Sequence, residues 1–155
     1  MKIVFFSSPD YAIPLLKKIQ DLGHDLSIVI TQRSGQVRRH KVVNTAIYEY
    51  CKKYSINCVA SDNLNDEICN AIQLLKCDLG IIYAYGKILP TKLINIPKHG
   101  IINLHCSLLP AYRGAAPIQH ALIDGRDETG ITYFEINDKL DAGKILLQSK
   151  YEISD

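Results

Sequence analysis

Ile3-Val4-Phe5-Phe6 is an apolar run of β-branched and aromatic residues near the start of the chain, and Ser7-Ser8-Pro9 ends it. This composition is typical of a short strand buried on both faces, since a half-exposed strand alternates apolar and polar residues. Over 11–22 the apolar side chains recur at helical spacing, and Gly23 suits the end of a helix. The opening residues therefore predict a buried strand that leads into a helix.

The same order of strand and helix recurs along the chain. Strands that alternate with helices of about a dozen residues imply right-handed crossovers and a mostly parallel sheet with helices on both faces. We expect the further elements at these positions: strands at 26–31, 58–60, 78–83 and 100–105, a helix from Asn44 as its N-cap to Tyr54, and a helix over 63–76.

From Gly125 onward the pattern changes. Two β-rich runs, 130–136 and 144–152, are joined only by the loop 137–143. A connection this short favours an antiparallel pair. The sequence therefore predicts the α/β class, with a Rossmann-like, mostly parallel sheet and an antiparallel C-terminal strand pair. A chain of 155 residues suits one domain, 1–155.

Composition and charge argue against several classes of protein. The hydrophobic fraction of 47% and the charged fraction of 22% are typical of a soluble globular chain. A net charge of +2 is too small to demand a nucleic-acid or membrane partner, so any basic footprint must be local. The five cysteines show no Cys-x-x-Cys pairing, which argues against a disulfide framework and a zinc site. We expect a cytoplasmic protein without a membrane span.

Polar residues at the carboxyl ends of the strands are the candidates for chemistry, because the ligand crevice of an open α/β sheet lies there. The sequence lacks the glycine-rich loops that bind NAD and ATP. Asn103 and His105 are two residues apart in a strand, so both side chains leave the same face. An amide donor and an imidazole suit a carbonyl that becomes an oxyanion. Cys106 points to the opposite face, which argues against a Cys-His nucleophile.

Two further segments each allow two interpretations. The loop 107–117 contains apolar residues that packing against a ligand would explain. Alternatively, Leu108 and Leu109 fill the core and Arg113 is a surface charge. Asp141 lies in a turn between strands, where it either forms an Asx turn or returns to pair with His105.

Several motifs resemble the folate-dependent formyltransferases. They are Ile102 to Pro110, Tyr112 to Gln119, Glu128 to Thr132, Leu140 to Gly143 and Ala84 to Pro90, and the resemblance covers essentially the whole chain. It implies that Asn103, His105 and Asp141 are the catalytic trio and that 10-formyltetrahydrofolate is the formyl donor, with no metal. The donor would be held largely by backbone groups of Tyr85, Gly86, Lys87, Ile88, Leu89 and Asp138.

The run Arg113 to Gln119 is most similar to the branch of the family that formylates the α-amine of initiator methionyl-tRNA in translation initiation. This resemblance implies a direct attack of the amine on the formyl carbon, with tRNA phosphates meeting the basic loop 33–41. It implies no membrane and no protein partner. The acceptor would contact Ser107, Leu108, Leu109, Pro110, Arg113, Gly114, Arg33, Arg38 and Arg39.

Members of that branch carry a second, β-barrel domain that helps to grip tRNA. The resemblance therefore implies that 1–155 is a truncated catalytic domain without the β-barrel. Two alternatives stay open at this point. In the first, the chemistry is the same and the acceptor is an amino sugar or another small amine. In the second, the domain binds folate or RNA without catalysing transfer.

Overall fold

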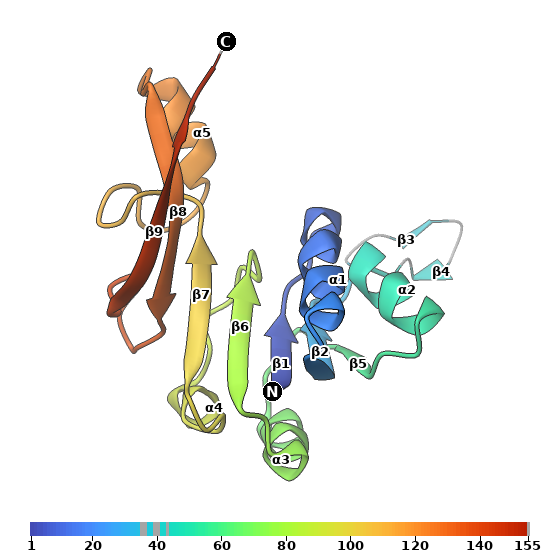
Figure 1. Ribbon diagram of the computed structural model, residues 1–155. Helices are drawn as coiled ribbons and strands as arrows, with labels where there is room; N and C mark the ends of the chain where they lie inside the picture. Colours follow the sequence, from blue (N-terminus) through green and yellow to red (C-terminus); the bar gives the residue numbers. More distant parts are fainter. Residues whose placement is uncertain (35–36, 39–40, 43, 155) are drawn as a thin grey trace.

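A seven-stranded sheet organises the chain (Figure 1), and the computed structural model describes residues 1–34, 37–38, 41–42 and 44–154. The strands lie in the order β5-β2-β1-β6-β7-β8-β9. The first five in this order are parallel, whereas β8 is antiparallel to both β7 and β9. This arrangement confirms the predicted fold class. The bounds are β1 (Lys2–Phe6), β2 (Asp25–Thr31), β5 (Cys58–Ala60), β6 (Leu79–Tyr83), β7 (Ile101–His105), β8 (Glu128–Glu135) and β9 (Ile145–Glu152).

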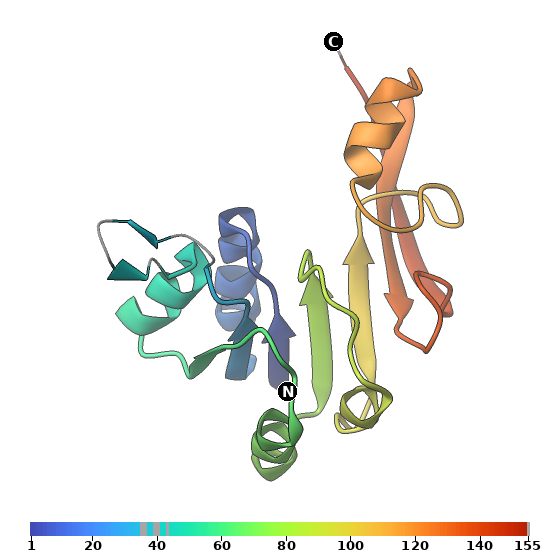
Figure 2. The same cartoon turned by 180° about the vertical axis from the view of Figure 1, so that it is seen from behind.

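Helices cover both faces of the sheet (Figure 2 gives the view from behind). α1 and α2 pack on one face through Leu16 and Ile47, whereas α3 packs on the other through Ile72. Adjacent residues of β1 divide between the two cores, since Val4 belongs to one and Phe5 to the other. The bounds are η1 (Asp10–Ala12), α1 (Ile13–Asp21), α2 (Ala46–Lys53), α3 (Asp66–Leu75), α4 (Thr91–Ile94) and α5 (Pro117–Ile123).

Local structure differs from the sequence-based expectations in three places. Thr45 rather than Asn44 caps α2, because Thr45 Oγ1 accepts a 3.2 Å hydrogen bond from a backbone N–H of the first turn. The basic stretch 32–41, expected as a loop, contributes to a short antiparallel ribbon of β3 (Val37–Arg38) and β4 (Lys41–Val42). No helix was expected at α4 or α5, since four and seven residues give little periodicity.

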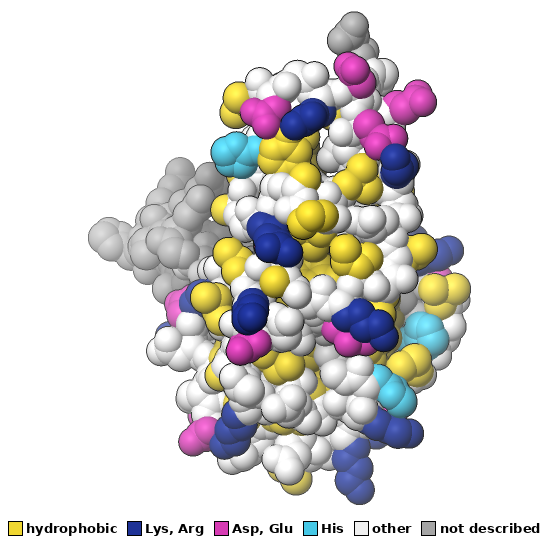
Figure 3. Space-filling view, turned by 90° about the vertical axis from the view of Figure 1, so that its left-hand side faces the viewer, with side chains coloured by type: hydrophobic (Ala, Val, Ile, Leu, Met, Phe, Trp, Pro, Cys, Tyr) yellow, Lys and Arg dark blue, Asp and Glu magenta, His cyan; other side chains and the backbone are white. Residues whose placement is uncertain are grey.

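β9 forms one edge of the sheet, and its side chains are mostly exposed. Figure 3 shows hydrophobic side chains interspersed with Lys and Arg on this side of the molecule. The large apolar residues exposed on β9 are Ile145, Leu146, Leu147 and Tyr151. Among the described residues, no helix is long and apolar enough to cross a membrane.

The register of the sheet places the candidate site. Asn103 of β7 lies between Ile82 of β6 and Phe134 of β8, and His105 lies beside Thr132. Paired positions in a sheet point to the same face. Ile82 belongs to the core that α3 and α4 cover. Asn103 and His105 therefore leave the sheet on that face, near the carboxyl end of β7.

Candidate active site

His105 and Asp141 come together although they are distant in the chain. His105 ends β7 and is only 6% exposed, and its Nδ1 lies 3.7 Å from Oδ2 of Asp141 in the β8–β9 loop. The backbone N–H of Gly114 donates a 2.7 Å hydrogen bond to the same Oδ2. The local side-chain hydrogen bond of this loop is made by Asn137 instead, whose Oδ1 accepts from the backbone N–H of Lys139 at 2.9 Å. The Asp141 carboxylate thus faces His105 instead of forming an Asx turn.

The side-chain amide of Asn103 is half-buried and unengaged. It shares a face of β7 with His105, and it makes no hydrogen bond to the described part of the chain. Polar groups removed from water normally have partners, so an unengaged amide at a strand end is available to a ligand. A carbonyl oxygen that reached Asn103 would meet an amide donor on the same strand face as His105.

The backbone carbonyl of Tyr112 contacts the other ring nitrogen of His105. Nε2 lies 2.8 Å from the Tyr112 oxygen. A carbonyl oxygen only accepts hydrogen bonds, so Nε2 carries the hydrogen. Sequence reasoning missed this contact because a backbone atom makes it, and no pattern of side chains reveals it. With Asp141 on the opposite side, each ring nitrogen of His105 faces an oxygen with negative charge or partial charge.

The loop Ser107–Pro110, expected to bind substrate, has most of its side chains packed into the protein. Ser107 is fully buried, and Leu109 is 5% exposed. Thr132 Oγ1 donates a 2.6 Å hydrogen bond to the Ser107 carbonyl and accepts one of 3.0 Å from the Leu109 N–H. Leu108 lies against Gly130, where a Cβ would come within 2.4 Å of it. These contacts fit the interpretation in which the leucines fill the core. Of the residues expected to contact the acceptor in this part of the chain, Pro110 and Arg113 are exposed.

The loop after β6 contains the residues expected to hold the folate donor. Tyr85 is 1% exposed, and its ring packs edge-on against Phe6 at 5.7 Å between centroids. Burial raises the pKa of Tyr85 to about 12, and its hydroxyl has no hydrogen-bond partner in the described structure. Leu89 is also buried. Their side chains therefore belong to the core, and the Tyr85 carbonyl accepts a hydrogen bond from Gln32 Nε2. Gly86 has a φ of +74° and is exposed.

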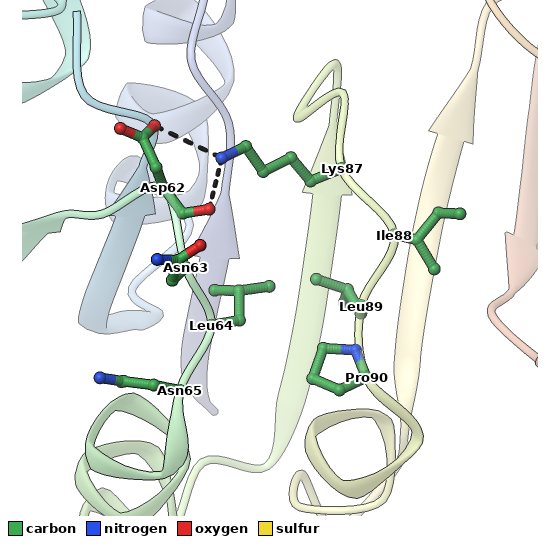
Figure 4. A pocket seen from close by; sticks show the side chains of 8 residues that line it. All are labelled: Asp62, Asn63, Leu64, Asn65, Lys87, Ile88, Leu89 and Pro90. Atoms are coloured by element: carbon green, nitrogen blue, oxygen red, sulfur yellow. Dashed lines mark hydrogen bonds and ion pairs between the residues drawn. The ribbon is translucent and has the colours of Figure 1, made fainter.

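A cavity of about 460 Å³ lies beside this loop (Figure 4). Figure 4 shows the Lys87 side chain reaching toward Asp62, and the two form an ion pair of 3.4 Å. Ile88 is 87% exposed at the same loop. An isoleucine that protrudes beside a cavity is the kind of surface that a ligand ring covers. The cavity is lined by Asp62, Asn63, Leu64, Asn65, Lys87, Ile88, Leu89 and Pro90.

The other residues expected to bind the donor or the acceptor lie on several elements. Asp138 is exposed in the β8–β9 loop. Arg33 is exposed, and its backbone N–H donates to Asp62 Oδ1 at 3.2 Å, beside the cavity. Arg38 lies in β3, and Arg39 lies outside the described residues.

Cys106 lies on the face of β7 opposite to His105. The pKa of Tyr83 is raised to about 12, mainly by burial and next by the neighbouring Cys106. The Cys106 thiol therefore lies next to the Tyr83 phenol. Tyr83 pairs with Leu104, so it belongs to the face that Asn103 and His105 do not share. Within the described ranges, no group of three or more His, Cys, Asp or Glu residues could hold a metal ion.

The site thus brings together an amide and a buried imidazole on one strand face, with a carboxylate beside the imidazole, and this arrangement suits a carbonyl that gains negative charge. The family model described as formyl transferase matches residues 1–155. The chain therefore belongs to the formyl transferase family.

Its relatives include enzymes named methionyl-tRNA formyltransferase. The protein of that name from Caldicellulosiruptor saccharolyticus is 41% identical over 157 residues, which cover 99% of this chain and 50% of the relative. The one from Sulfurihydrogenibium sp. is 41% identical over 158 residues, which cover 100% and 51%. The chain thus spans about half the length of the curated relatives it matches.

Solved structures share the fold at lower identity. A phosphoribosylglycinamide formyltransferase from Bacillus halodurans superposes with a TM-score of 0.83 at 21% identity, covering 100% of this chain and 81% of that one. A formyltetrahydrofolate deformylase from Pseudomonas syringae pv. tomato gives 0.77 at 21% identity, covering 99% and 51%. At such identities the likeness shows the fold alone.

Proposed function

We propose that this chain transfers a formyl group from 10-formyltetrahydrofolate to the α-amine of initiator methionyl-tRNA. The observation that carries the proposal is the buried His105, which has the Asp141 carboxylate 3.7 Å away and the unengaged Asn103 amide on the same strand face. The trio is suited to a carbonyl that gains negative charge. It offers no nucleophile of its own, so the acceptor amine attacks the formyl carbon directly.

In the proposed reaction the amine nitrogen forms a bond to the formyl carbon, and the carbonyl electrons move onto oxygen. Asn103 and an N–H of His105 donate to that oxygen, while the Asp141 carboxylate balances the charge on the imidazole. The bond from the formyl carbon to the donor nitrogen then breaks, and the amine proton passes to that nitrogen. Donors placed before the reaction avoid reorganisation, and one such donor typically accounts for about 10²- to 10³-fold in rate.

The donor site is supported by the loop after β6. The cavity beside Lys87, the exposed Ile88 and the open backbone at Gly86 suit a flat heterocycle with a polar tail. β6 is the immediate parallel neighbour of β7 in the sheet, so the loop after β6 begins at the same edge as the end of β7.

The acceptor is supported by the relatives named methionyl-tRNA formyltransferase, at 41% identity over nearly the whole chain. Arg33 and the basic residues up to Lys41 would meet the phosphates of the RNA. On this proposal the protein acts in the cytoplasm, in translation initiation.

The test compares acceptors at a fixed concentration of 10-formyltetrahydrofolate. Charged initiator methionyl-tRNA, an amino sugar and a simple amine are supplied separately, and kcat/KM is measured for each. We expect the tRNA to be preferred by at least about a hundredfold. Preference for a small amine would contradict the proposed acceptor, and folate binding without transfer to any acceptor would favour an inactive binding domain.

A further inference from the structure

Tyr112 adopts a backbone conformation that aims its carbonyl at His105. Its φ is 56°, in the left-handed region that residues other than glycine rarely adopt. Its carbonyl oxygen lies 2.8 Å from His105 Nε2. Strained conformations of this kind persist only where surrounding contacts hold them.

The contacts that hold Tyr112 are made by its hydroxyl. Its Oη donates a 2.8 Å hydrogen bond to Asp124 Oδ2, and Arg126 Nε donates a 2.9 Å hydrogen bond to the same Oη. Asp124 is the C-cap of α5, and the backbone N–H of Arg126 donates to the Ala121 carbonyl at 3.0 Å. The Tyr112 ring is therefore tied to the C-terminal end of α5.

We propose that Tyr112 is a positioning residue for His105, and that Asp124 and Arg126 act through it. This inference rests on the proposed function, because it assigns the orientation of the imidazole that acts on the formyl oxygen. The Tyr112 carbonyl holds the hydrogen on Nε2, so Nδ1 is turned toward Asp141. A ring with an acceptor at each nitrogen is held in one orientation.

Of the two contacts that His105 makes, the longer one, to Asp141, is the one that a ligand can replace. The 2.8 Å contact to Tyr112 has hydrogen-bond length, whereas the 3.7 Å separation from Asp141 is too long for a hydrogen bond. Nδ1 is therefore the ring nitrogen left open to a ligand that enters between the ring and the carboxylate. Tyr112 keeps the ring from rotating while this exchange occurs.

The test removes the hydroxyl and keeps the ring. Tyr112→Phe loses both hydrogen bonds that hold the side chain, and Tyr151→Phe makes the same chemical change at an exposed position on β9. We expect Tyr112→Phe to lower kcat about three- to tenfold with KM for the donor within about twofold, because the change loosens the His105 ring and leaves the loop after β6 untouched. Tyr151→Phe should match the parent.

A second measurement reads the ring directly. Nitrogen-15 NMR of the His105 side chain reports which ring nitrogens carry hydrogen, and it needs no activity. We expect Tyr112→Phe to shift the Nε2 signal and to speed exchange of its hydrogen, whereas Tyr151→Phe leaves both unchanged. Arg126→Gln, at an exposed position, should produce a smaller shift in the same direction.

The outcomes separate this inference from the proposed function. Parental kcat together with unchanged His105 signals in Tyr112→Phe would overturn the positioning role, whatever the acceptor is. A parent chain that transfers no formyl group would count against the proposed function, while the NMR comparison would still decide whether Tyr112 orients the ring.

Discussion

At the scale of single residues, the proposed site places a carboxylate next to a buried ring. Asp141 has a φ of 44°, and its Oδ2 accepts from Gly114 at 2.7 Å while it faces His105. Asp and Asn tolerate this backbone region better than other residues with a side chain. Replacing Asp141 with Asn therefore removes the carboxylate charge while the backbone conformation and the side-chain shape are kept.

Asp141→Asn is expected to lower kcat by about a hundredfold with a small change in stability. The amide can still accept from Gly114 and adopt the left-handed backbone, but it no longer places a negative charge beside the His105 ring. Steady-state transfer kinetics and thermal unfolding measure the two effects. Asp127→Asn, at an exposed position before β8, is the matched control. A kcat within threefold of the parent would contradict the role of the charge.

Tyr85→Phe is expected to raise the free energy of unfolding by about 1 kcal/mol, because it removes a buried hydroxyl that lacks a partner. The pKa of Tyr85 is raised from 10.0 to about 12 by burial, so between these values the unfolded state releases the proton first. The parent therefore loses stability as pH rises from about 10 to about 12. Tyr85→Phe should lose less over that window.

Urea unfolding at neutral pH and above pH 10 checks both parts of the Tyr85 prediction. Tyr54→Phe, at a residue that is 53% exposed, serves as the control and should behave as the parent does. A Tyr85→Phe protein less stable than the parent at neutral pH would show that the hydroxyl has a stabilising partner.

At the scale of elements, close packing of backbone fixes the loop that carries Asp141. A Cβ on Gly143 would lie 1.6 Å from the Glu135 carbonyl oxygen at the end of β8. The backbone at Glu135 or at Gly143 would have to move to relieve an overlap of that size. The absence of a side chain at Gly143 therefore sets where the β8–β9 loop turns.

Gly143→Ala is expected to destabilise the protein by more than about 3 kcal/mol, or to displace the loop and abolish transfer. Gly23→Ala is the comparison, because its Cβ would meet nothing within 4 Å and only its φ of +77° is unfavourable. Gly23→Ala should lower the free energy of unfolding by about 1–2 kcal/mol. Chemical denaturation of both variants measures the difference, and equal costs would contradict the packing argument.

Periodicity and composition predict most of the elements, since a buried strand and an amphipathic helix each leave a local signal. They miss α4 and α5, whose lengths are near one or two turns. They cannot place the Thr132 contacts with the Ser107–Leu109 segment, because these join residues more than twenty positions apart. The His105–Tyr112 contact escapes for another reason, namely that a carbonyl makes it. Asn103 and His105, on one strand face, were predictable from their spacing.

At the scale of the whole molecule, the sheet grades from a covered centre to an open edge. Val4, Phe5 and Phe6 of β1 are fully buried between two layers of helices, whereas β9 is exposed along nearly its whole length. Local opening costs least where few apolar contacts are lost. Stability should therefore vary across the sheet in the same order.

Amide hydrogen exchange is expected to be slowest in β1 and β6 and at least about a hundredfold faster in β9. The site lies at β7, between these extremes. Exchange followed by NMR or mass spectrometry at neutral pH measures the gradient. Uniform protection across all seven strands would contradict it.

The central claim is that His105 and its neighbours carry out formyl transfer at the carboxyl edge of β7. The most direct measurement is a single-turnover transfer from 10-formyltetrahydrofolate to charged initiator methionyl-tRNA, with the parent, His105→Ala and His99→Ala side by side. His99 is exposed near the opposite end of β7, so His99→Ala makes the same substitution away from the site. The account predicts that His105→Ala slows transfer by at least about a hundredfold while His99→Ala matches the parent. Equal rates in all three proteins would contradict it.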